Sequence, residues 1–477
     1  MAFNTLNYAW FFGCVFLVSW LLVRLRLMRL LFLLVASYFF YGNFAWYYLP
    51  LILASSSVDY WLGNRIAACE DPKRRKRWLI VTVIVNLGML GFFKYWDFGL
   101  DTVAAAAQSF GWTPSLPYLR LMLPIGISFF TFESMSYVID VYRGTTKPCD
   151  SYWKYLLFVA FFPHLVSGPI VRPRDLIPQF ERAPVFDEVE GSRALFLICV
   201  GLFKKVVISD YLSVNLVDRV FNNPIDYSAL ETLAGIYGYA VQIYCDFSGY
   251  TDIAIGCAAL LGVTFPINFN SPYKAMNLQD FWNRWHISLS SWLRDYLFLP
   301  LGGSIGSTAR TVRNFIILML LGGLWHGAAW HFVFWGLLHG VGLAATFVYW
   351  MWLQERGIRR RRRKLSPLRR VAGVLVTFHY VCLCWVFFRA DSFAKAWAVL
   401  KRLTTLTLYH PNLHPWVLAA LAVGLITHYT PDDWFERARA EFSSLPGWAQ
   451  GVLLFCVAVL LREAATSQAV PFVYFQF

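Results

Sequence analysis

Two histidines in apolar surroundings are the residues of this sequence best suited to chemistry. His326 follows a run from Phe315 to Trp325 that contains only apolar residues and glycine. Ionisable side chains at membrane depth are rare and usually functional, although a structural hydrogen bond between helices is the alternative interpretation. An imidazole, with an ordinary pKa near 6.5, accepts a proton from a hydroxyl at neutral pH. Where water is excluded, this chemistry suits acyl transfer to a hydroxyl, and it also suits a proton relay in a transporter.

The second histidine, His286, lies in a segment, 280–300, whose pattern predicts one helix at the membrane interface. Residues at alternating steps of three and four form an aromatic stripe and a separate polar stripe. Tryptophan and tyrosine are typical of the headgroup region. His286 lies between the stripes, so the pattern leaves open whether it faces the bundle interior or solvent. The stripes consist of Trp282, Trp285, Leu289, Trp292 and Tyr296, and of Arg284, Ser288, Ser291 and Asp295.

Two carboxylates, Asp246 and Asp252, interrupt an otherwise apolar span. Carboxylates at membrane depth must be paired, protonated or in contact with water. We interpret the pair as a polar break that lines a cavity, and a pair of carboxylates acting as acid and base is the alternative. Lys204 and Lys205, near the start of another span, are interpreted as snorkelling toward the interface.

A third polar region combines Glu133 with the segment 162–169. Glu133 and Asp140 are seven residues apart and therefore share one face of a predicted span. The segment 162–169 contains proline and glycine and is typical of a broken helix. We interpret His164 within it as structural.

Metal and serine chemistry are not predicted. His331 follows His326 by five residues, which places the two about 140° apart on one helix, too far around it to share a metal. The sequence has no HExxH motif, no Cys and His spacing typical of zinc sites, and no GxSxG motif.

Composition indicates what must position these groups. Of the 477 residues, 58% are hydrophobic and 15% charged, whereas soluble domains carry about 25% charged residues. The basic residues lie at the ends of apolar runs, which argues against nucleic-acid binding. The sequence therefore predicts an all-α, multi-pass membrane protein forming one domain, 1–477, because no loop is long enough for a separate one. The candidate spans are 7–23, 28–43, 47–63, 78–96, 119–141, 154–171, 192–213, 231–262, 312–325, 328–350, 371–388, 414–428 and 447–461.

The basic residues also predict orientation. Every second loop is basic, including 24–29, 73–77 and 143–147, and the positive-inside rule places such loops in the cytoplasm. The N-terminus is then outside, and its first apolar stretch, which lacks the basic region of a signal peptide, is the first span. The run 359–364 is interpreted as another cytoplasmic loop in contact with anionic lipid.

These motifs together resemble the membrane-bound O-acyltransferases, and within them the bacterial branch that includes the alginate O-acetyltransferases of exopolysaccharide synthesis. The resemblance covers most of the chain, and its histidine motifs are highly specific, with His286 and His326 separated by 40 residues as in the family's pair of active-site positions. The matching segments are 123–133, 162–165, 167–169, 246–250, 281–289 and 324–327.

The resemblance implies a fold and a site. The fold would be a ring of about 11–13 transmembrane or re-entrant helices around a central tunnel. His326 corresponds to the family's catalytic histidine and His286 to its supporting position. No cofactor is expected to be bound, and acetyl-CoA is the expected donor. Arg284 and Arg294 are expected either to contact its phosphates or to hold their own helix. The remaining residues expected to bind substrate are Asp246, Trp325 and Ser288.

The resemblance also implies an acceptor and a partner. An acetyl group would cross the inner membrane toward hydroxyls of an exopolysaccharide, alginate among them, or of a cell-wall glycan. Because the outer loops are too short to bind a polymer, we expect a periplasmic acetyltransferase- or esterase-like partner. The alternatives are D-alanyl transfer to teichoic acid by a related branch, a transporter or flippase, and an inactive scaffold. Segments 281–286 and 471–477 resemble the acetyltransferase branch more closely.

Overall fold

The computed structural model describes residues 2–357, 366–464 and 470–472, and these contain helices and no strand. This confirms the all-α prediction. The basic run 359–364 and residues 473–477 of the closing segment lie outside the described residues. The ring, the tunnel and the number of membrane helices stay predictions.

The chain divides into two compact units. Unit 1 comprises Met1–Ala194 and Ala254–Pro266, and unit 2 comprises Leu195–Ile253 and Ile267–Phe477. A long helix, α12 (Ala229–Leu260), contributes its first part to unit 2 and its last turns to unit 1. The prediction of a single domain stays a prediction.

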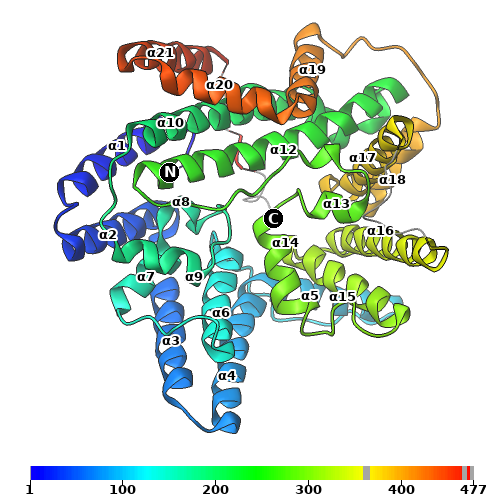
Figure 1. The fold of residues 1–477 in the computed structure, drawn as a ribbon. Coiled ribbons are helices and arrows are strands. Elements are labelled where there is room, and N and C mark those ends of the chain that lie inside the picture. The colour runs from blue at the N-terminus through cyan, green and yellow to red at the C-terminus, as the bar shows by residue number, and fades with distance from the viewer. Residues whose placement is uncertain (1, 358–365, 465–469, 473–477) are drawn as a thin grey trace. The chain divides into compact units, whose positions relative to one another are not determined.

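Unit 1 begins with long helices and continues into short, broken ones (Figure 1). The predicted span 154–171 is divided between two short helices, as its proline and glycine predict. The elements are α1 Leu6–Leu21, α2 Arg26–Ala45, η1 Trp46–Tyr48, α3 Leu49–Ala68, α4 Pro72–Leu90, η2 Gly91–Tyr95, α5 Trp96–Ser109, α6 Ile127–Arg143, α7 Tyr152–Ala160, α8 Phe162–Leu165, α9 Pro173–Leu176, η3 Ile177–Glu181 and the first part of α10 Glu188–Leu202.

Unit 2 holds the rest of α10, most of α12 and the C-terminal helices. Its π-helical segments η4, η5 and η8 were not predicted, and such segments are frequent near functional sites. The elements are η4 Phe203–Asp210, η5 Ser213–Val217, α11 Asp218–Asn222, η6 Pro224–Asp226, η7 Pro272–Lys274, α13 Leu278–Trp282, α14 Ile287–Leu293, η8 Arg294–Phe298, α15 Thr308–His326, α16 Trp330–Glu355, α17 Pro367–Arg389, α18 Phe393–Leu403, α19 Pro415–Tyr429, α20 Asp432–Ser444 and α21 Gly447–Ala464.

Several helices begin where local chemistry requires it. Thr5, Ser307 and Ser366 precede α1, α15 and α17, and each side-chain oxygen accepts a hydrogen bond from a backbone N–H of the first turn. Such caps satisfy donors that have no partner within the helix. Pro367 then opens α17, at a position where its missing N–H costs nothing.

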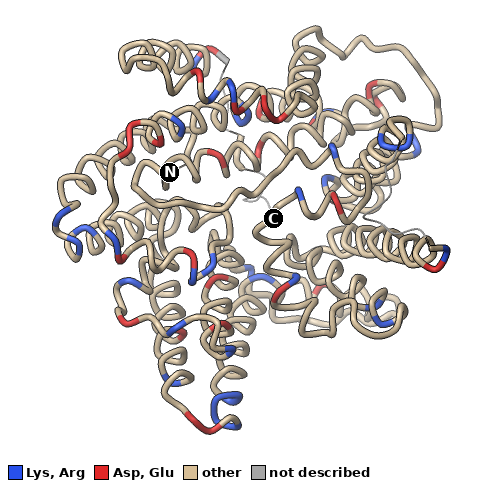
Figure 2. Tube along the Cα trace, in the orientation of Figure 1, with Lys and Arg blue, Asp and Glu red and all other residues tan. Residues whose placement is uncertain are grey.

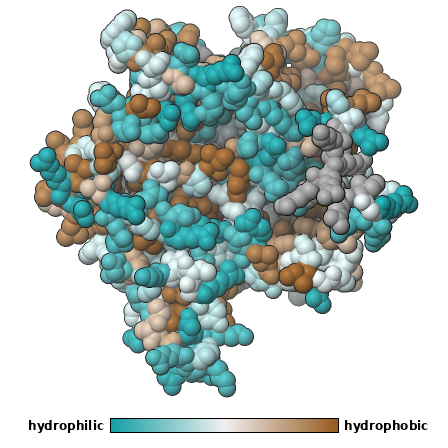
Figure 3. Space-filling model, in the orientation of Figure 1, coloured by the Kyte–Doolittle hydropathy of each residue, from teal (hydrophilic) through white to brown (hydrophobic). Residues whose placement is uncertain are grey.

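Four described helical runs are long and apolar enough to cross a membrane: Arg26–Ala68, Pro72–Ser109, Trp330–Glu355 and Pro367–Arg389. Shorter helices are also apolar on their exposed faces. Hydrophobic side chains cover the surface over α19, where Trp416 is 69% and Ile426 64% exposed (Figure 3). Apolar surface of this kind is unfavourable in water and suits contact with lipid.

Basic side chains gather at the turn between α3 and α4 (Figure 2). Within unit 1, Arg75 from this turn donates a hydrogen bond to the carbonyl oxygen of Tyr142, at 2.9 Å, and its guanidinium lies 5.5 Å from the Tyr142 ring. Two of the predicted cytoplasmic loops therefore adjoin each other, which agrees with their lying on one side of a membrane.

Candidate functional site

An antiparallel pair of helices, α15 and α16, carries His326 at the end of its first member (Figure 1). The two backbones approach closely at glycines. A Cβ on Gly323 would lie 2.2 Å from the carbonyl oxygen of Phe332, and one on Gly336 would lie 2.2 Å from that of Met319. Only glycine fits such an approach, so the contact fixes where α15 ends and where His326 lies.

Aromatic rings enclose His326, which is 5% exposed. The rings of Trp335 and Phe388 meet the imidazole edge-on, with centroids 5.0 and 5.3 Å away, and Trp325 lies 5.0 Å away. These rings come from α15, α16 and α17. The imidazole is thus held in a rigid, mostly apolar setting on unit 2.

His286 occupies a break in the chain and not the middle of a helix, so the predicted continuous helix over 280–300 is wrong. α13 ends at Trp282, α14 begins at Ile287, and His286 adopts the left-handed conformation with φ of 43°. The cause is a neighbouring extended segment. Its residue Asn268 accepts a hydrogen bond from the backbone N–H of Ile287, at 2.9 Å. This tertiary hydrogen bond overrides the helical pattern of the sequence.

The side chain of Asn268 also fixes the protonation of His286. Its Oδ1 accepts hydrogen bonds from the backbone N–H and the hydroxyl of Ser288, at 3.1 and 2.9 Å. A backbone N–H can only donate, so the Asn268 atom it meets is the oxygen. The Nδ1 of His286 lies 3.2 Å from the same oxygen and must therefore carry the hydrogen. In neutral His286, the lone pair is then on Nε2.

The structure brings the two histidines to one aromatic cluster. The Trp325 ring, next to His326 in sequence, lies 6.2 Å from the His286 ring. Phe247 of α12 meets His286 edge-on at 4.6 Å. His286, Trp325 and His326 thus form a continuous series of ring contacts within unit 2, and their roles in a reaction stay predictions.

The other residues predicted to bind substrate have structural partners. Ser288 contacts Asn268, as described above. Arg284 pairs with Asp280 at 2.8 Å and donates to the carbonyl oxygen of Asn270 at 3.2 Å. Arg294 pairs with the adjacent Asp295 at 2.8 Å, and its side chain is 62% exposed. Their roles toward a substrate stay predictions.

Asp246 and Asp252 belong to a continuous helix, α12, as the predicted span 231–262 implies, and the cavity that they were expected to line stays a prediction. Each carboxylate is paired with a lysine, which is one of the ways in which a buried carboxylate is stabilised. Asp246 lies 2.6 Å from the Nζ of Lys205, and Asp252 lies 2.7 Å from that of Lys204. Lys205 also contacts Asp210 at 2.7 Å. The lysines therefore turn inward, and their predicted snorkelling is wrong.

Two glycines, Gly201 of α10 and Gly249 of α12, face each other and let the charged side chains near them come together. A Cβ on Gly249 would lie 2.7 Å from the carbonyl oxygen of Gly201, and one on Gly201 would lie 2.6 Å from that of Gly249. Close contact of the two helices brings Lys205 to Asp246. Sequence reasoning missed Asn268, Asp210 and these ion pairs, although Gly201 and Gly249 beside charged residues were an available signal.

The argument that separated His331 from His326 also rested on a wrong premise. The two residues lie on different helices, because the chain turns at residues 327–329 between α15 and α16. His331 donates from Nδ1 to the carbonyl oxygen of Phe387, at 3.1 Å. This hydrogen bond ties α16 to α17.

Unit 1 contains a different kind of histidine. The Nδ1 of His164 lies 3.0 Å from the Oε1 of Glu133, and both side chains are at most 1% exposed. The same Glu133 oxygen accepts a hydrogen bond from the backbone N–H of Val171, at 3.2 Å. A Cβ on Gly168 would lie 2.4 Å from the Cα of His164, so this turn also requires glycine. The pair holds together the broken segment that follows α7.

Comparisons with known proteins agree with this arrangement. Residues 149–388, which include both histidines of the aromatic cluster, match the membrane-bound O-acyltransferase family, MBOAT. The chain is 42% identical to probable alginate O-acetylase AlgI of Pseudomonas aeruginosa over 408 residues, 84% of this chain and 74% of that protein. It is 37% identical to the peptidoglycan O-acetyltransferase of Helicobacter pylori over 398 residues, 78% and 73% of the two chains. It is 30% identical to the teichoic acid D-alanyltransferase of Bacillus subtilis over 297 residues, 59% and 72% of the two chains.

The family match spans half of the chain, and the similarity to O-acetyltransferases extends over most of it. Because the relatives are acyltransferases, the match favours an enzyme over the transporter and scaffold alternatives. The apolar helices agree with the membrane setting that the family name states. The chain therefore belongs to the membrane-bound O-acyltransferase family and is a multi-pass membrane enzyme related to alginate O-acetylases and a peptidoglycan O-acetyltransferase.

Proposed function

We propose that this enzyme transfers an acetyl group from acetyl-CoA on the cytoplasmic side toward hydroxyls of a polysaccharide outside the inner membrane, with His326 as the base. One observation carries the proposal: a histidine held at the end of α15, enclosed by rigid aromatic rings and in ring contact with Trp325. Such a setting presents a proton acceptor while excluding bulk water, which would otherwise hydrolyse a thioester.

The chemistry follows from these groups. His326 takes the proton of the acceptor hydroxyl as its oxygen attacks the thioester carbonyl carbon. A carbon–oxygen bond forms, and the tetrahedral intermediate collapses with cleavage of the carbon–sulfur bond. The imidazolium of His326 returns the proton to the departing thiolate, so that CoA leaves as the thiol and the base is regenerated.

His286 is proposed as a positioning residue. Asn268 holds its Nδ1–H, so the neutral ring directs its lone pair from Nε2, where it can accept a hydrogen bond. Contacts with Phe247 and Trp325 fix the plane of the ring. The substrate site is proposed to be shaped by Trp325, Ser288 and Asp246. Trp325 contacts the ring of His286, Ser288 contacts Asn268, and Asp246 pairs with Lys205. Both arginines pair with a carboxylate, but Arg294 is 62% exposed, so it suits the donor's phosphates better than Arg284, which also donates to the carbonyl oxygen of Asn270.

The acceptor is proposed to be an exopolysaccharide or a cell-wall glycan, reached through a periplasmic acetyltransferase- or esterase-like partner. This follows the names of two relatives, which state alginate and peptidoglycan. The proposal includes an inner-membrane location with the N-terminus outside. D-alanyl transfer to teichoic acid is the second candidate, favoured by the 30% identity to the enzyme of Bacillus subtilis.

The test uses purified enzyme in lipid vesicles with labelled acetyl-CoA and an acceptor polysaccharide, with and without a periplasmic partner. We expect release of CoA and labelled acceptor from the native enzyme, and neither from His326→Ala. His410→Ala is the matched control, because His410 is exposed and outside the cluster. Undiminished turnover by His326→Ala would contradict the role of the base. Label from a D-alanyl thioester of a carrier protein, without label from acetyl-CoA, would favour the second candidate.

A further inference from the structure

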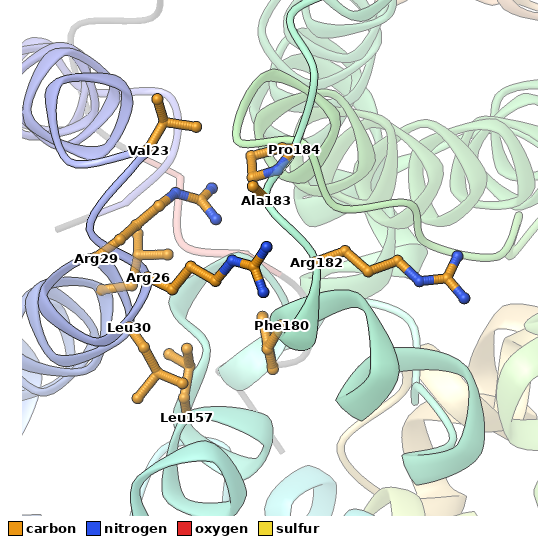
Figure 4. A pocket seen from close by; sticks show the side chains of 10 residues that line it. Val23, Arg26, Arg29, Leu30, Leu157, Phe180, Arg182, Ala183 and Pro184 are labelled. Carbon is orange, nitrogen blue, oxygen red and sulfur yellow. The ribbon is translucent and has the colours of Figure 1, made fainter.

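Unit 1 contains a pocket at the start of α2 that the proposed reaction does not use (Figure 4). Arg26 and Arg29 of α2 line one side, and the other side is lined by Phe180, Arg182, Ala183 and Pro184. The space between these side chains, part of which is open solvent, measures about 300 Å³. Apolar side chains, among them Leu30 and Leu157, line the same pocket, so cationic and apolar surfaces adjoin.

Arg29 is a buried cation without a counter-charge in the described part of the chain. It is 8% exposed. Its Nε donates to the hydroxyl of Ser19 at 3.0 Å, and its Nη2 donates to the carbonyl oxygen of Leu261 at 2.6 Å. Both acceptors are neutral. Because burying a guanidinium without an anion is costly, the site lacks a negative charge that a ligand would supply.

A second guanidinium, that of Arg26, reaches toward the same space. It extends from α2 toward Phe180 on the opposite wall (Figure 4). Arg26 is exposed, and among the described residues it has no ion pair or hydrogen bond from its side chain. Two guanidinium groups from one helix turn, both without a carboxylate, therefore line the same pocket.

The opposite wall is held in place from three sides. The side chain of Gln179 donates to the carbonyl oxygen of Thr264 at 3.0 Å and accepts from its backbone N–H at 2.8 Å. Gly262, with φ of 73°, packs so closely that an added Cβ would lie 2.3 Å from the Cβ of Pro184. The Phe186 ring meets that of Trp20 edge-on at 5.4 Å. The pocket is thus a preformed feature of unit 1.

We propose that this pocket binds the phosphate group of an anionic phospholipid. Guanidinium groups bind phosphate oxygens through paired, charge-assisted hydrogen bonds. Leu30 and Leu33 follow the arginines along α2, which begins one of the apolar runs able to cross a membrane, so an acyl chain can continue along the same helix. A phosphate of coenzyme A shares the headgroup chemistry but would leave this apolar side without a partner.

The test measures lipid retention by the intact protein. The enzyme is reconstituted in nanodiscs of phosphatidylcholine with added phosphatidylglycerol, extracted gently, and examined by native mass spectrometry. We expect retained phosphatidylglycerol in preference to phosphatidylcholine. Arg26→Gln should weaken retention about tenfold, because one charge-assisted interaction is lost. Arg29→Lys keeps the charge but not both internal hydrogen bonds and should weaken it as well.

Arg24→Gln is the matched control, since Arg24 is an exposed neighbour that does not line the pocket. Equal losses in Arg24→Gln and Arg26→Gln would indicate general attraction to a basic surface and overturn the proposal. No preference for phosphatidylglycerol in the native protein would overturn it too. Displacement of the bound lipid by free coenzyme A, but not by inorganic phosphate, would overturn the lipid assignment in favour of the nucleotide. This readout does not depend on acyl transfer, so the two proposals can fail separately.

Discussion

Two buried histidines, His164 in unit 1 and His326 in unit 2, are held in different ways. His164 faces the carboxylate of Glu133, which also accepts a backbone hydrogen bond, so the imidazole is part of a polar clamp. His326 faces the rings of Trp335 and Phe388 and lies next to Gly327, at the end of a helix. The polar clamp stabilises a broken segment. The aromatic enclosure fixes the orientation of the His326 ring.

The comparison teaches that burial by itself does not distinguish a structural from a functional histidine. Both side chains are at most 5% exposed. The two histidines differ in the groups that surround them. The carboxylate of Glu133 contacts the Nδ1 of His164, whereas the rings of Trp335 and Phe388 pack against the imidazole of His326. Substitutions in unit 1 should therefore reduce stability, and substitutions in the cluster of unit 2 should reduce turnover.

The largest expected effect is on turnover. His326→Ala should lower kcat by about 10²–10⁴-fold, the usual contribution of a general base. The amount of folded protein should change little, because the glycine contacts between α15 and α16 that fix the end of α15 are retained. Initial rates of CoA release from labelled acetyl-CoA, normalised to folded protein, measure the effect. If the variant instead aggregates and its folded fraction retains full activity, the contrast between the two histidines is wrong.

The converse effect is expected in unit 1. Glu133→Ala should destabilise the protein by about 3–5 kcal/mol, because it leaves His164 buried without its partner. Glu133→Gln, which keeps an oxygen for the N–H of Val171, should cost less. Midpoints of thermal unfolding in detergent give the order of the variants. Turnover per folded molecule should remain near that of the native enzyme, and a selective loss of kcat at full stability would contradict the structural role.

Local patterns in the sequence predicted much of the fold. Apolar runs identified most of the helices, including 231–262 for α12, and the residue types at Thr5 and Ser307 suit helix starts. The pairs that fix the site are distant in sequence. Asn268 and His286 are brought together by an extended segment, and Lys205 and Asp246 by a close helix contact. No local period encodes such pairs, which is why the break before α14 was missed.

The candidate site itself was named from motif resemblance and not from periodicity. The spacing of polar and aromatic residues over 280–300 predicts a continuous helix, and it does not determine whether His286 faces the bundle interior or solvent. The structure resolves the direction, since Asn268 holds its Nδ1 and Phe247 packs against its ring. Tertiary hydrogen bonds thus decided what intrinsic propensity could not.

A smaller effect should follow from the support of His286. Asn268→Ala removes the oxygen that accepts from both Ser288 groups and faces His286, and should lower kcat about tenfold, the cost of one buried hydrogen-bond partner. Asn268→Asp retains oxygens at this position and should restore part of the activity. A change in stability without a change in kcat for both variants would place Asn268 in the fold alone and separate it from the site.

The smallest expected effect concerns a surface contact of η7, which follows the segment that holds Asn268. Lys274 donates hydrogen bonds to the carboxylate of Asp432 and to the carbonyl oxygen of Thr430, each at 2.7 Å. The hydrogen bond from Lys274 lowers the pKa of Asp432 below its ordinary value. A carboxyl group whose pKa is lower in the folded state stabilises the fold above its unfolded pKa, and this stabilisation disappears as the pH falls through the folded pKa.

Asp432→Asn tests this contact. Because the Asp432 side chain is 70% exposed, the loss at neutral pH should be below about 1 kcal/mol. The difference from the native protein should shrink as the pH falls below the ordinary aspartate pKa of about 3.9, and it should vanish only once the native carboxyl group is protonated as well. Unfolding midpoints between neutral and acidic pH measure the difference, and turnover at neutral pH should be unchanged. A large loss of turnover would mean that the Lys274–Asp432 contact affects His286 as strongly as Asn268 does. The expected difference between the effect of this exposed contact and that of the buried Asn268–His286 contact would then be wrong.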